Sequence, residues 1–486
     1  MTDHKLDVPT LPPADPRRWR ALGALSLVRF VIVIDNTVVN VALPSIRHAL
    51  HLSATGLVWV VNGYMLAGGG LLVLGGRMAD LLGRRRMFLV GTAVFGLASM
   101  MSGLAPNSGV LIASRFAQGI GEALAAPAAL SLLVLLFPQG TERSRALSIW
   151  GAIAGIGSIL GVLLSGVLTS VVGWRWVFLV NLPFAAAALV LVPRLIPQSP
   201  PTAPGRRVDV VGAVLVTGGL VSLVDGLLAA SHHALGDAAV VVPLALGAVA
   251  LGAFVAVEAR IAEPLVPLRV LADKTRSSAN LATLFLFACF SATFLLLTLL
   301  MQDVLHYSAL QTGLAYLPLC FAFIGGFALS GFTGSRLGTK GTLLVGFTVA
   351  SIGMLLLSRA SATGSYAVTL LPGMCVFAVG LGMSIPALQV AALHGATEHD
   401  AGLSSGVQST AQAVAGALGN AVLFTVALRY TSSRLAGGAG HAVAEAAGYR
   451  VGFVVGAGVL VGGALLVLFA IRCPPSPATT LQPTAA

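Results

Sequence analysis

The sequence predicts an all-α polytopic membrane protein with fourteen transmembrane helices, on three observations. Hydrophobic residues make up 57% of the 486 residues and charged residues only 9%, whereas about a quarter of a soluble domain is charged. Apolar segments recur along the whole chain, and most are close to the roughly 20 residues that cross a bilayer as a helix. The basic residues lie mainly in short loops between these segments, so we attribute the net charge of +11 to topology and expect no nucleic-acid partner.

Taken in order, the apolar segments form two groups of six with two more between them. Residues 1–20 are polar and Pro-rich and lack the cleavage pattern of a signal peptide, so we expect a retained N-terminal tail. Residues 21–195 form a six-helix bundle, 196–276 a linker, a two-helix insert and a charged loop, 277–471 a second six-helix bundle, and 472–486 a C-terminal tail. The predicted spans are 21–43, 57–75, 87–105, 109–136, 146–170, 177–193, 209–229, 238–257, 277–300, 312–332, 342–358, 366–390, 404–428 and 451–471.

The basic residues predict the orientation of the chain. An even number of spans places both termini on one side of the membrane, and short cytoplasmic loops carry an excess of Lys and Arg. With both termini inside, the inner loops and tails hold 20 of the 28 Lys and Arg residues, and the outer loops hold 6. We therefore expect both termini in the cytoplasm.

The most strongly basic loop lies between spans two and three, at residues 76–86, and reads GRMADLLGRRR. Residues 331–340 of the second half repeat its pattern, with Gly338 in the place of Gly83. Glycine permits a tight turn and a close approach of helices. Two halves related by a parallel repeat are typical of transporters, with the substrate site near the midplane between them.

Four local signatures resemble those of the major facilitator superfamily, specifically its fourteen-span drug:proton antiporter branch, and the resemblance covers essentially the full length. They are the loop at 76–86, DNTVVNVALP at 35–44, LIASRFAQG at 111–119 and WRWVFLVNLP at 174–183. The resemblance implies a protein of the bacterial plasma membrane that exports lipophilic drugs or antibiotics in exchange for protons by alternating access. It also implies a cytoplasmic latch, for which the candidate residues are Gly76, Asp80, Gly83, Arg84 and Arg85 with Gly331, Arg336 and Gly338 of the repeat. A merely topogenic basic loop is the alternative.

Four charged residues fall within spans one and four, and a charge inside a bilayer is costly enough to mark a path or a relay. At a rise of 1.5 Å per residue, Asp35 and Arg115 lie about 12 and 9 Å from the outer ends of their spans. Arg29 and Glu122 lie about 21 and 20 Å from those ends. Depth therefore pairs Asp35 with Arg115 and Arg29 with Glu122. The motifs of the family place an acid at the first position and a base at the second, whereas the deeper pair is particular to this chain.

We expect the four charged residues to couple transport to protons, with Asp35 as the carrier. Burial favours the neutral acid and Arg115 favours the carboxylate, so a change in either would switch protonation. The alternative for each pair is a static ion pair that holds two helices together. Acidic residues near the cavity favour lipophilic cations as substrates, an effect that the neighbouring arginines oppose.

Other residues complete the expected site. Asn40, Gln118, Gln408 and Gln412 are candidates for contact with substrate, and hydrogen bonding between helices is the alternative. Gln302 and Asp303 close span nine, where we expect a solvated helix end. The chain has no phosphate-binding loop motif and no metal-ligand spacing of cysteines, so we expect no cofactor, no metal, no enzyme activity and transport driven by the proton gradient.

The expected partners are a lipophilic small molecule, protons and the lipid bilayer, and we expect a monomer. Three other functions remain open on the same fold. They are export of one specific endogenous metabolite or lipid, import, and a transport-inactive sensor.

Overall fold

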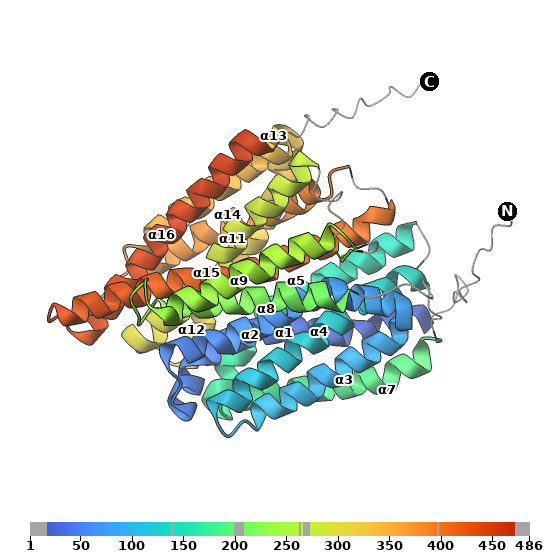
Figure 1. Ribbon diagram of the computed structural model, residues 1–486, viewed down its shortest axis with the longest axis horizontal. Helices are drawn as coiled ribbons and strands as arrows, with labels where there is room; N and C mark the ends of the chain where they lie inside the picture. Colours follow the sequence, from blue (N-terminus) through green and yellow to red (C-terminus); the bar gives the residue numbers. More distant parts are fainter. Residues whose placement is uncertain are drawn as a thin grey trace.

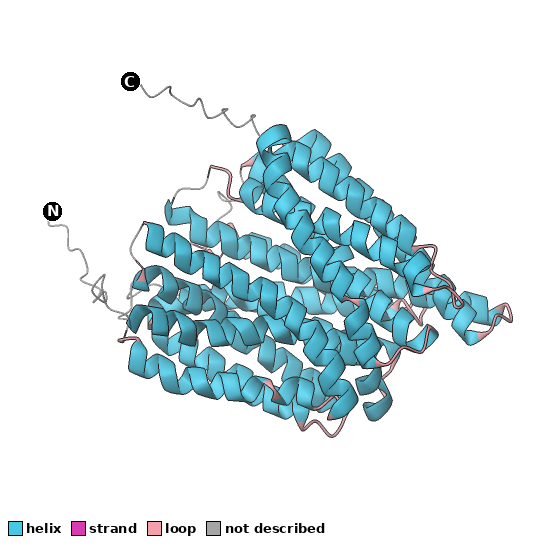
Figure 2. Cartoon of the chain, turned by 180° about the vertical axis from the view of Figure 1, so that it is seen from behind, coloured by secondary structure: helices cyan, strands magenta, loops and turns pink. Residues whose placement is uncertain are grey.

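The computed structural model describes residues 17–137, 140–198, 209–261, 264–265, 273–395 and 398–471. The predicted tails, apart from the first turn of helix at residues 17–20, lie outside these residues. Long helices make up nearly all of the described chain, and no strand occurs in these ranges (Figure 2). Because an even number of spans alternates in direction, the first helix begins and the last helix ends at the same face. We call this the terminal face and the opposite one the distal face.

The first half is a bundle of six spans, as its apolar segments predict. Short polar caps fix where the helices begin: the side chain of Ser53 accepts a hydrogen bond from the backbone N–H of Gly56, and Asn107 does the same for Val110. Such caps satisfy N–H groups that have no partner inside the helix. The helices are α1 (Arg17–Leu50), α2 (Ala54–Leu82), α3 (Arg84–Gly103), α4 (Ser108–Leu136), α5 (Thr141–Val171), and α6 (Trp176–Leu179) continued by α7 (Asn181–Leu195).

The insert and the second half follow the same rules. Asp209 caps the first helix of the insert and Asp273 caps the first helix of the second half. The insert consists of α8 (Val210–Ala229) and α9 (Ala238–Glu258). The second half consists of α11 (Lys274–Leu299) with a π-helical end η1 (Leu300–Val304), α12 (Ala309–Ala315), α13 (Leu317–Leu357), the π-helical turn η2 (Tyr366–Leu370) leading into α14 (Leu371–Ala392), α15 (Glu398–Ala436) and α16 (His441–Ala470).

Thirteen helices of the described residues are long and apolar enough to cross a membrane. One of them contains α13, whose 41 residues measure about 60 Å at 1.5 Å per residue, twice the thickness of the hydrocarbon. Gly338 breaks α13 with a left-handed backbone (φ 68°, ψ 176°). Dividing the helix at this residue gives the fourteen spans that the sequence predicts.

The repeat between the two halves is visible in the backbone. Gly83, between α2 and α3, has φ 93°, and Gly338 has φ 68° at the corresponding place. A side chain is strained in this region of φ and ψ, so glycine serves both turns. The correspondence read from the sequence is therefore a correspondence of structure.

Glycine also lets helices pack closely within each half, which suits a bilayer where apolar association alone supplies little energy. A Cβ at Gly121 of α4 would lie 2.5 Å from the backbone nitrogen of Phe95 in α3. A Cβ at Gly353 of α13 would overlap the backbone of Phe377 in α14. These contacts hold α4 against α3 and α13 against α14.

The insert lies alongside both halves (Figure 1). Its helix α8 packs against α2 of the first half and α15 of the second. Thr425 of α15 donates a hydrogen bond to the carbonyl oxygen of Leu227 at 2.9 Å. In contrast, the side chains of α9 are mostly exposed at its outer surface.

Candidate functional site

The centre of the first half holds a buried ion pair. Nη1 of Arg115 lies 2.6 Å from Oδ2 of Asp35, and both side chains are sealed from solvent at 1% and 0% exposure. Arg115 comes from α4 and Asp35 from α1. The Nε of Arg115 donates to the carbonyl oxygen of Val60 in α2 at 2.9 Å, so the pair ties three helices together.

Amide and hydroxyl groups complete this pair from two more helices. Oδ1 of Asp35 accepts hydrogen bonds from Nε2 of Gln118 at 2.7 Å and from Nδ2 of Asn181 in α7 at 2.9 Å. Asn181 also donates to Oγ of Ser99 in α3 at 2.9 Å. We call Asp35, Ser99, Arg115, Gln118 and Asn181 the polar cluster, and none of them exceeds 1% exposure. Five of the six spans of the first half meet here.

Aromatic rings enclose the charge of Arg115. Its guanidinium carbon lies 4.3 Å from the ring centroid of Tyr64 and 5.7 Å from that of Phe178. A cation above the face of an aromatic ring is attracted by its quadrupole, most strongly where water is absent. Removing one partner of such a pair leaves an uncompensated buried charge, which costs about 3–5 kcal/mol. The attachment of α1 to α4 therefore depends on the negative charge of Asp35.

The sequence predicts the Asp35–Arg115 pair but misses part of its surroundings. Asn181 lies in the WRWVFLVNLP segment, so a signal for it exists in the sequence, whereas nothing marks Ser99. The amide of Gln118 is buried and held by Asp35 and Arg115 in this structure, and its contact with substrate stays a prediction. The role of Asp35 as a proton carrier stays a prediction.

The deeper charges behave differently. In the part of the chain that the structure describes, no ion pair joins Arg29 to Glu122. The Glu122 carboxylate lies against α2, where a Cβ at Gly68 would be 3.0 Å from its Oε2. The guanidinium carbon of Arg29 lies 5.9 Å from the ring centroid of Trp150 in α5. The second predicted pair is therefore not formed in this structure, because equal depth does not make two side chains point at each other.

The other expected cavity residues divide by exposure. Asn40 is partly exposed, as is Gln412, whereas Gln408 is buried at 4% exposure. Asn40 donates to the carbonyl oxygen of Asn36, one turn earlier in α1, at 2.9 Å. The side chains of Asn40 and Gln412 are therefore accessible, whereas that of Gln408 is not in contact with solvent.

The basic loop at residues 76–86 is held mainly by its own half. Asp80 pairs with Arg84 at 3.0 Å, and Arg85 donates to the carbonyl oxygen of Pro193 in α7 at 3.1 Å. Arg77 donates to the carbonyl oxygen of Pro264 beyond the insert at 2.5 Å. A Cβ at Gly76 would make only an ordinary contact, 3.7 Å from Pro127.

The repeat loop is more open than the first. The guanidinium carbon of Arg336 lies 4.1 Å from the ring centroid of Phe332, and a Cβ at Gly331 would meet nothing within 4 Å. Of the expected glycines, Gly83 and Gly338 are required by their backbone conformation, whereas packing does not require Gly76 or Gly331. The latch role of both loops stays a prediction.

Hydrogen bonds join the two halves from the midplane to the distal face. Gln302 donates to the carbonyl oxygen of Val41 at 2.8 Å, and Arg47 pairs with Asp303 at 3.3 Å. The end of span nine is therefore a contact with α1 and not the solvated helix end that we expect from the sequence. Nearer the midplane, α2 and α15 share three hydrogen bonds: Asn62 to Ala417 and Asn420 to Asn62, both at 2.9 Å, and Thr410 to Gly69, also at 2.9 Å. We call these contacts the distal seam.

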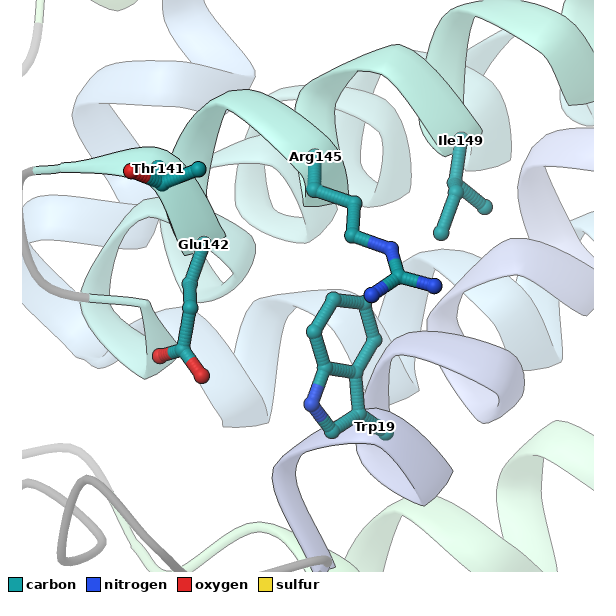
Figure 3. Close-up of a pocket in the computed structure, with 5 residues that line it drawn as sticks. All are labelled: Trp19, Thr141, Glu142, Arg145 and Ile149. Carbon is teal, nitrogen blue, oxygen red and sulfur yellow. The ribbon is translucent and has the colours of Figure 1, made fainter.

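A small hollow of about 450 Å³ lies at the terminal face, where α1 and α5 begin. Its lining is Trp19, Thr141, Glu142, Arg145 and Ile149, and Figure 3 shows the Arg145 guanidinium beside the Trp19 indole. The distance from guanidinium carbon to ring centroid is 5.5 Å. Trp and Arg are typical of helix ends at a membrane interface. None of the five residues belongs to the polar cluster.

Two helical bundles, a parallel repeat and buried charges in apolar spans define a membrane transporter. The sequence model of the Major Facilitator Superfamily matches residues 25–420, and the chain belongs to that family. It is therefore a multi-pass transporter of small molecules and not an enzyme.

Relatives with established names cover most of the chain. The lincomycin resistance protein of Streptomyces lincolnensis is 41% identical over 84% of this chain and 84% of its own length. The puromycin resistance protein pur8 of Streptomyces alboniger is 40% identical over 93% of this chain and 91% of its own length. The cephamycin export protein CmcT of Amycolatopsis lactamdurans is 39% identical over 87% of both chains.

Among solved structures, a bacterial homologue of the human lysosomal transporter Spinster, inward-facing and unoccupied, has a similar fold. The TM-score is 0.67 at 18% identity, over 95% of this chain and 100% of the other. This likeness concerns the fold alone.

Proposed function

We propose that this protein is a proton-coupled antiporter that exports antibiotics or other lipophilic compounds across the plasma membrane by alternating access. The observation that carries the coupling is the buried carboxylate of Asp35, bound by Arg115, Gln118 and Asn181. The direction and the kind of substrate rest on the relatives, whose names describe antibiotic resistance and export. They favour export of drugs over import.

The geometry suggests how a proton acts on the helices. As a carboxylate, Asp35 accepts three hydrogen bonds from α4 and α7. A protonated carboxyl group carries a donor of its own and has lost the charge that balances Arg115. Protonation would therefore weaken the attachment of α1 to α4 and α7 and free α1 to move. Loss of the proton would restore the attachment.

Alternating access requires the distal seam to open. In this structure the seam is closed, and we place the distal face outside and the terminal face in the cytoplasm. Helix α1 takes part in both contacts, since it carries Asp35 and also contacts η1 through Val41 and Arg47. A proton that loosens α1 at Asp35 would thus act on the same helix that closes the distal face.

The proton gradient supplies enough energy for resistance. One proton moving through 100 mV yields about 2.3 kcal/mol, and one pH unit adds about 1.4 kcal/mol. Since about 1.4 kcal/mol is a factor of ten in an equilibrium constant, an electrically neutral drug exchanged for one proton reaches a ratio of a few hundredfold.

The first prediction concerns Asp35→Asn. In everted membrane vesicles, proton-driven drug uptake should fall to the level of vesicles without the protein, because Asn cannot take up and release the proton. Drug exchange without a proton gradient should persist. Asp225→Asn is the matched control, since Asp225 is an exposed acid of α8 outside the polar cluster. Proton-driven export that survives Asp35→Asn would exclude Asp35 as the carrier.

A further inference from the structure

Two opposite charges lie unpaired in the middle of the membrane. By helical rise, Arg29 lies about 18 Å from the start of α1 and Glu122 about 21 Å from each end of α4, and both side chains are partly exposed. No ion pair joins them among the described residues. A charge at this depth is costly unless water or a ligand solvates it.

The exposed surface of Glu122 faces the interior of the protein. Glu122 lies seven residues after the buried Arg115 and therefore on the same face of α4. It is about 200° around the helix from Ile120, which is 40% exposed on the outer side. A Cβ at Gly68 of α2 would lie 3.0 Å from Oε2 of Glu122, so glycine makes room for the carboxylate.

Arg29 begins a polar face along α1. Asn36 and Asn40 follow it by seven and eleven residues, which places all three within about 40° of one another. Asn36 is exposed and the other two are partly exposed. Helix α1 packs against α4, α5 and α7 of its own half and against α11 and α12 of the other. The exposed polar face of α1 therefore belongs to a helix that contacts both halves of the transporter.

The guanidinium of Arg29 has free donors on this face. Its Nε is buried and has no hydrogen-bond partner, and its described neighbour is the ring of Trp150. A guanidinium carries five N–H donors and binds carboxylates in a bidentate manner. Arg29 thus presents an unfilled anion site beside the unfilled cation site of Glu122.

We propose that this face is the charge-recognition part of the substrate site and that it takes zwitterionic compounds. A basic nitrogen of the substrate binds Glu122, and an acidic oxygen binds Arg29. Such a ligand satisfies both charges and adds no net charge to the midplane. The proposal rests on the export function above and assigns Arg29 and Glu122 to substrate, in place of the proton-coupling role that the sequence suggests.

Three forms of one fluorescent drug test the charge requirement. Ciprofloxacin is a zwitterion, its methyl ester is a cation and its N-acetyl derivative is an anion. Uptake into everted vesicles is measured for each, with ethidium as an unrelated cation. Wild type should favour the zwitterion over both derivatives by about tenfold or more in kcat/KM, the worth of a charged hydrogen bond.

Substitutions that remove one charge at a time then show which residue recognises which group of the substrate. Glu122→Gln should erase the preference over the N-acetyl form alone, and Arg29→Gln the preference over the methyl ester alone. Arg29→Lys keeps the charge and should retain most of the preference. Gel filtration and thermal unfolding of the purified variants exclude misfolding. Asp225→Asn is the control for loss of an acidic side chain elsewhere in a membrane helix.

Three results would overturn the proposal while leaving the export function intact. They are a wild type that exports ethidium but does not favour the zwitterion, single variants that slow all compounds equally, and a double variant that transports better than either single one. The last result would identify a static ion pair. A wild type that exports no compound at all would instead count against the export function itself.

Discussion

Asp35 is held by more groups than an ion pair requires. Arg115 and Gln118 approach it from α4 and Asn181 from α7, and each distance lies between 2.6 and 2.9 Å. Charge-assisted hydrogen bonds of this kind are stronger than neutral ones. The Asp35 carboxylate therefore joins α1 to both α4 and α7, and a relative movement of these helices would break some of its hydrogen bonds.

Arg115 is expected to be irreplaceable by lysine. Its Nε bonds to Val60 and its plane lies against Tyr64, neither of which an ammonium group reproduces. Arg115→Lys should destabilise the purified protein by about 2 kcal/mol through lost buried hydrogen bonds and reduce drug transport at least tenfold. Thermal unfolding in detergent and vesicle uptake measure the two effects.

A matched substitution separates geometry from charge. Arg359→Lys changes an arginine in the short distal turn after α13, far from the polar cluster, and should leave both measurements unchanged. Wild-type transport by the Arg115→Lys variant would show that the positive charge alone suffices at residue 115.

Helical rise predicts both ion pairs from depth alone, and the part of the chain that the structure describes contains the Asp35–Arg115 pair but not the Arg29–Glu122 pair. Helical rise gives depth, and depth is enough for Asp35 and Arg115 because both happen to face the centre of the first half. It fails for Arg29 and Glu122, since rotation about each helix also decides which groups meet. Ser99 and Tyr64 could not be found, because ordinary residues in apolar helices acquire their role only through the packing of other helices.

Helix α5 contains glycines of two kinds: some pack against another helix, and others face open space. A Cβ at Gly166 would lie 2.9 Å from the carbonyl oxygen of Ala309 in α12, and Leu310 donates its backbone N–H to Ser170 at 3.2 Å. A Cβ at Gly155 would meet nothing within 4 Å. Helix α5 therefore contributes to the closed distal face through Gly166.

Gly166→Ala should favour opening of the distal face. The added methyl group pushes α5 from α12, whose backbone cannot yield as a flexible side chain would. The reporter is Asn40→Cys in a variant without the native cysteines. A membrane-impermeant maleimide should label it several times faster in right-side-out vesicles, because the distal seam covers this part of α1. Gly155→Ala, in the same helix, should label at the wild-type rate. Equal rates in the two variants would contradict a role for the α5–α12 contact in closure.

Hydropathy predicts the elements well. Each of the fourteen expected segments lies within helices of the structure or extends beyond them by at most two residues, and Gly338 alone makes two of them look like one long helix. The sequence gives no sign of the π-helical end η1, which places Gln302 and Asp303 against α1. A single extra backbone residue in a helical turn leaves the apolar pattern almost unchanged.

For the whole molecule, the insert connects the halves across the distal seam. Helix α8 meets α2 at Gly70, where a Cβ would lie 2.5 Å from Oγ1 of Thr217, and it meets α15 through Leu227 and Thr425. The insert thus touches both bodies that must separate during alternating access.

Thr425→Val should reveal this connection. It removes the hydrogen bond to Leu227 and keeps the shape of the side chain, at a cost of about 1 kcal/mol between membrane helices. We expect the transport rate to change by about twofold or more and the thermal unfolding temperature of the purified protein to fall only slightly. Thr348→Val is the control, since Thr348 is exposed and bonds only within α13. Identical rates for the two variants would make the insert a passive attachment.

The two left-handed turns at Gly83 and Gly338 mark corresponding places in two copies of one structural unit, and the two copies differ in chemistry. The polar cluster and the charged face of α1 and α4 belong to the first copy. Both the proposed proton carrier and the proposed substrate charges therefore belong to the first half. The second copy contributes Gln302, Asp303 and α15 to the distal seam, so a change there would alter the closure of the transporter and leave the charged groups of the first half in place.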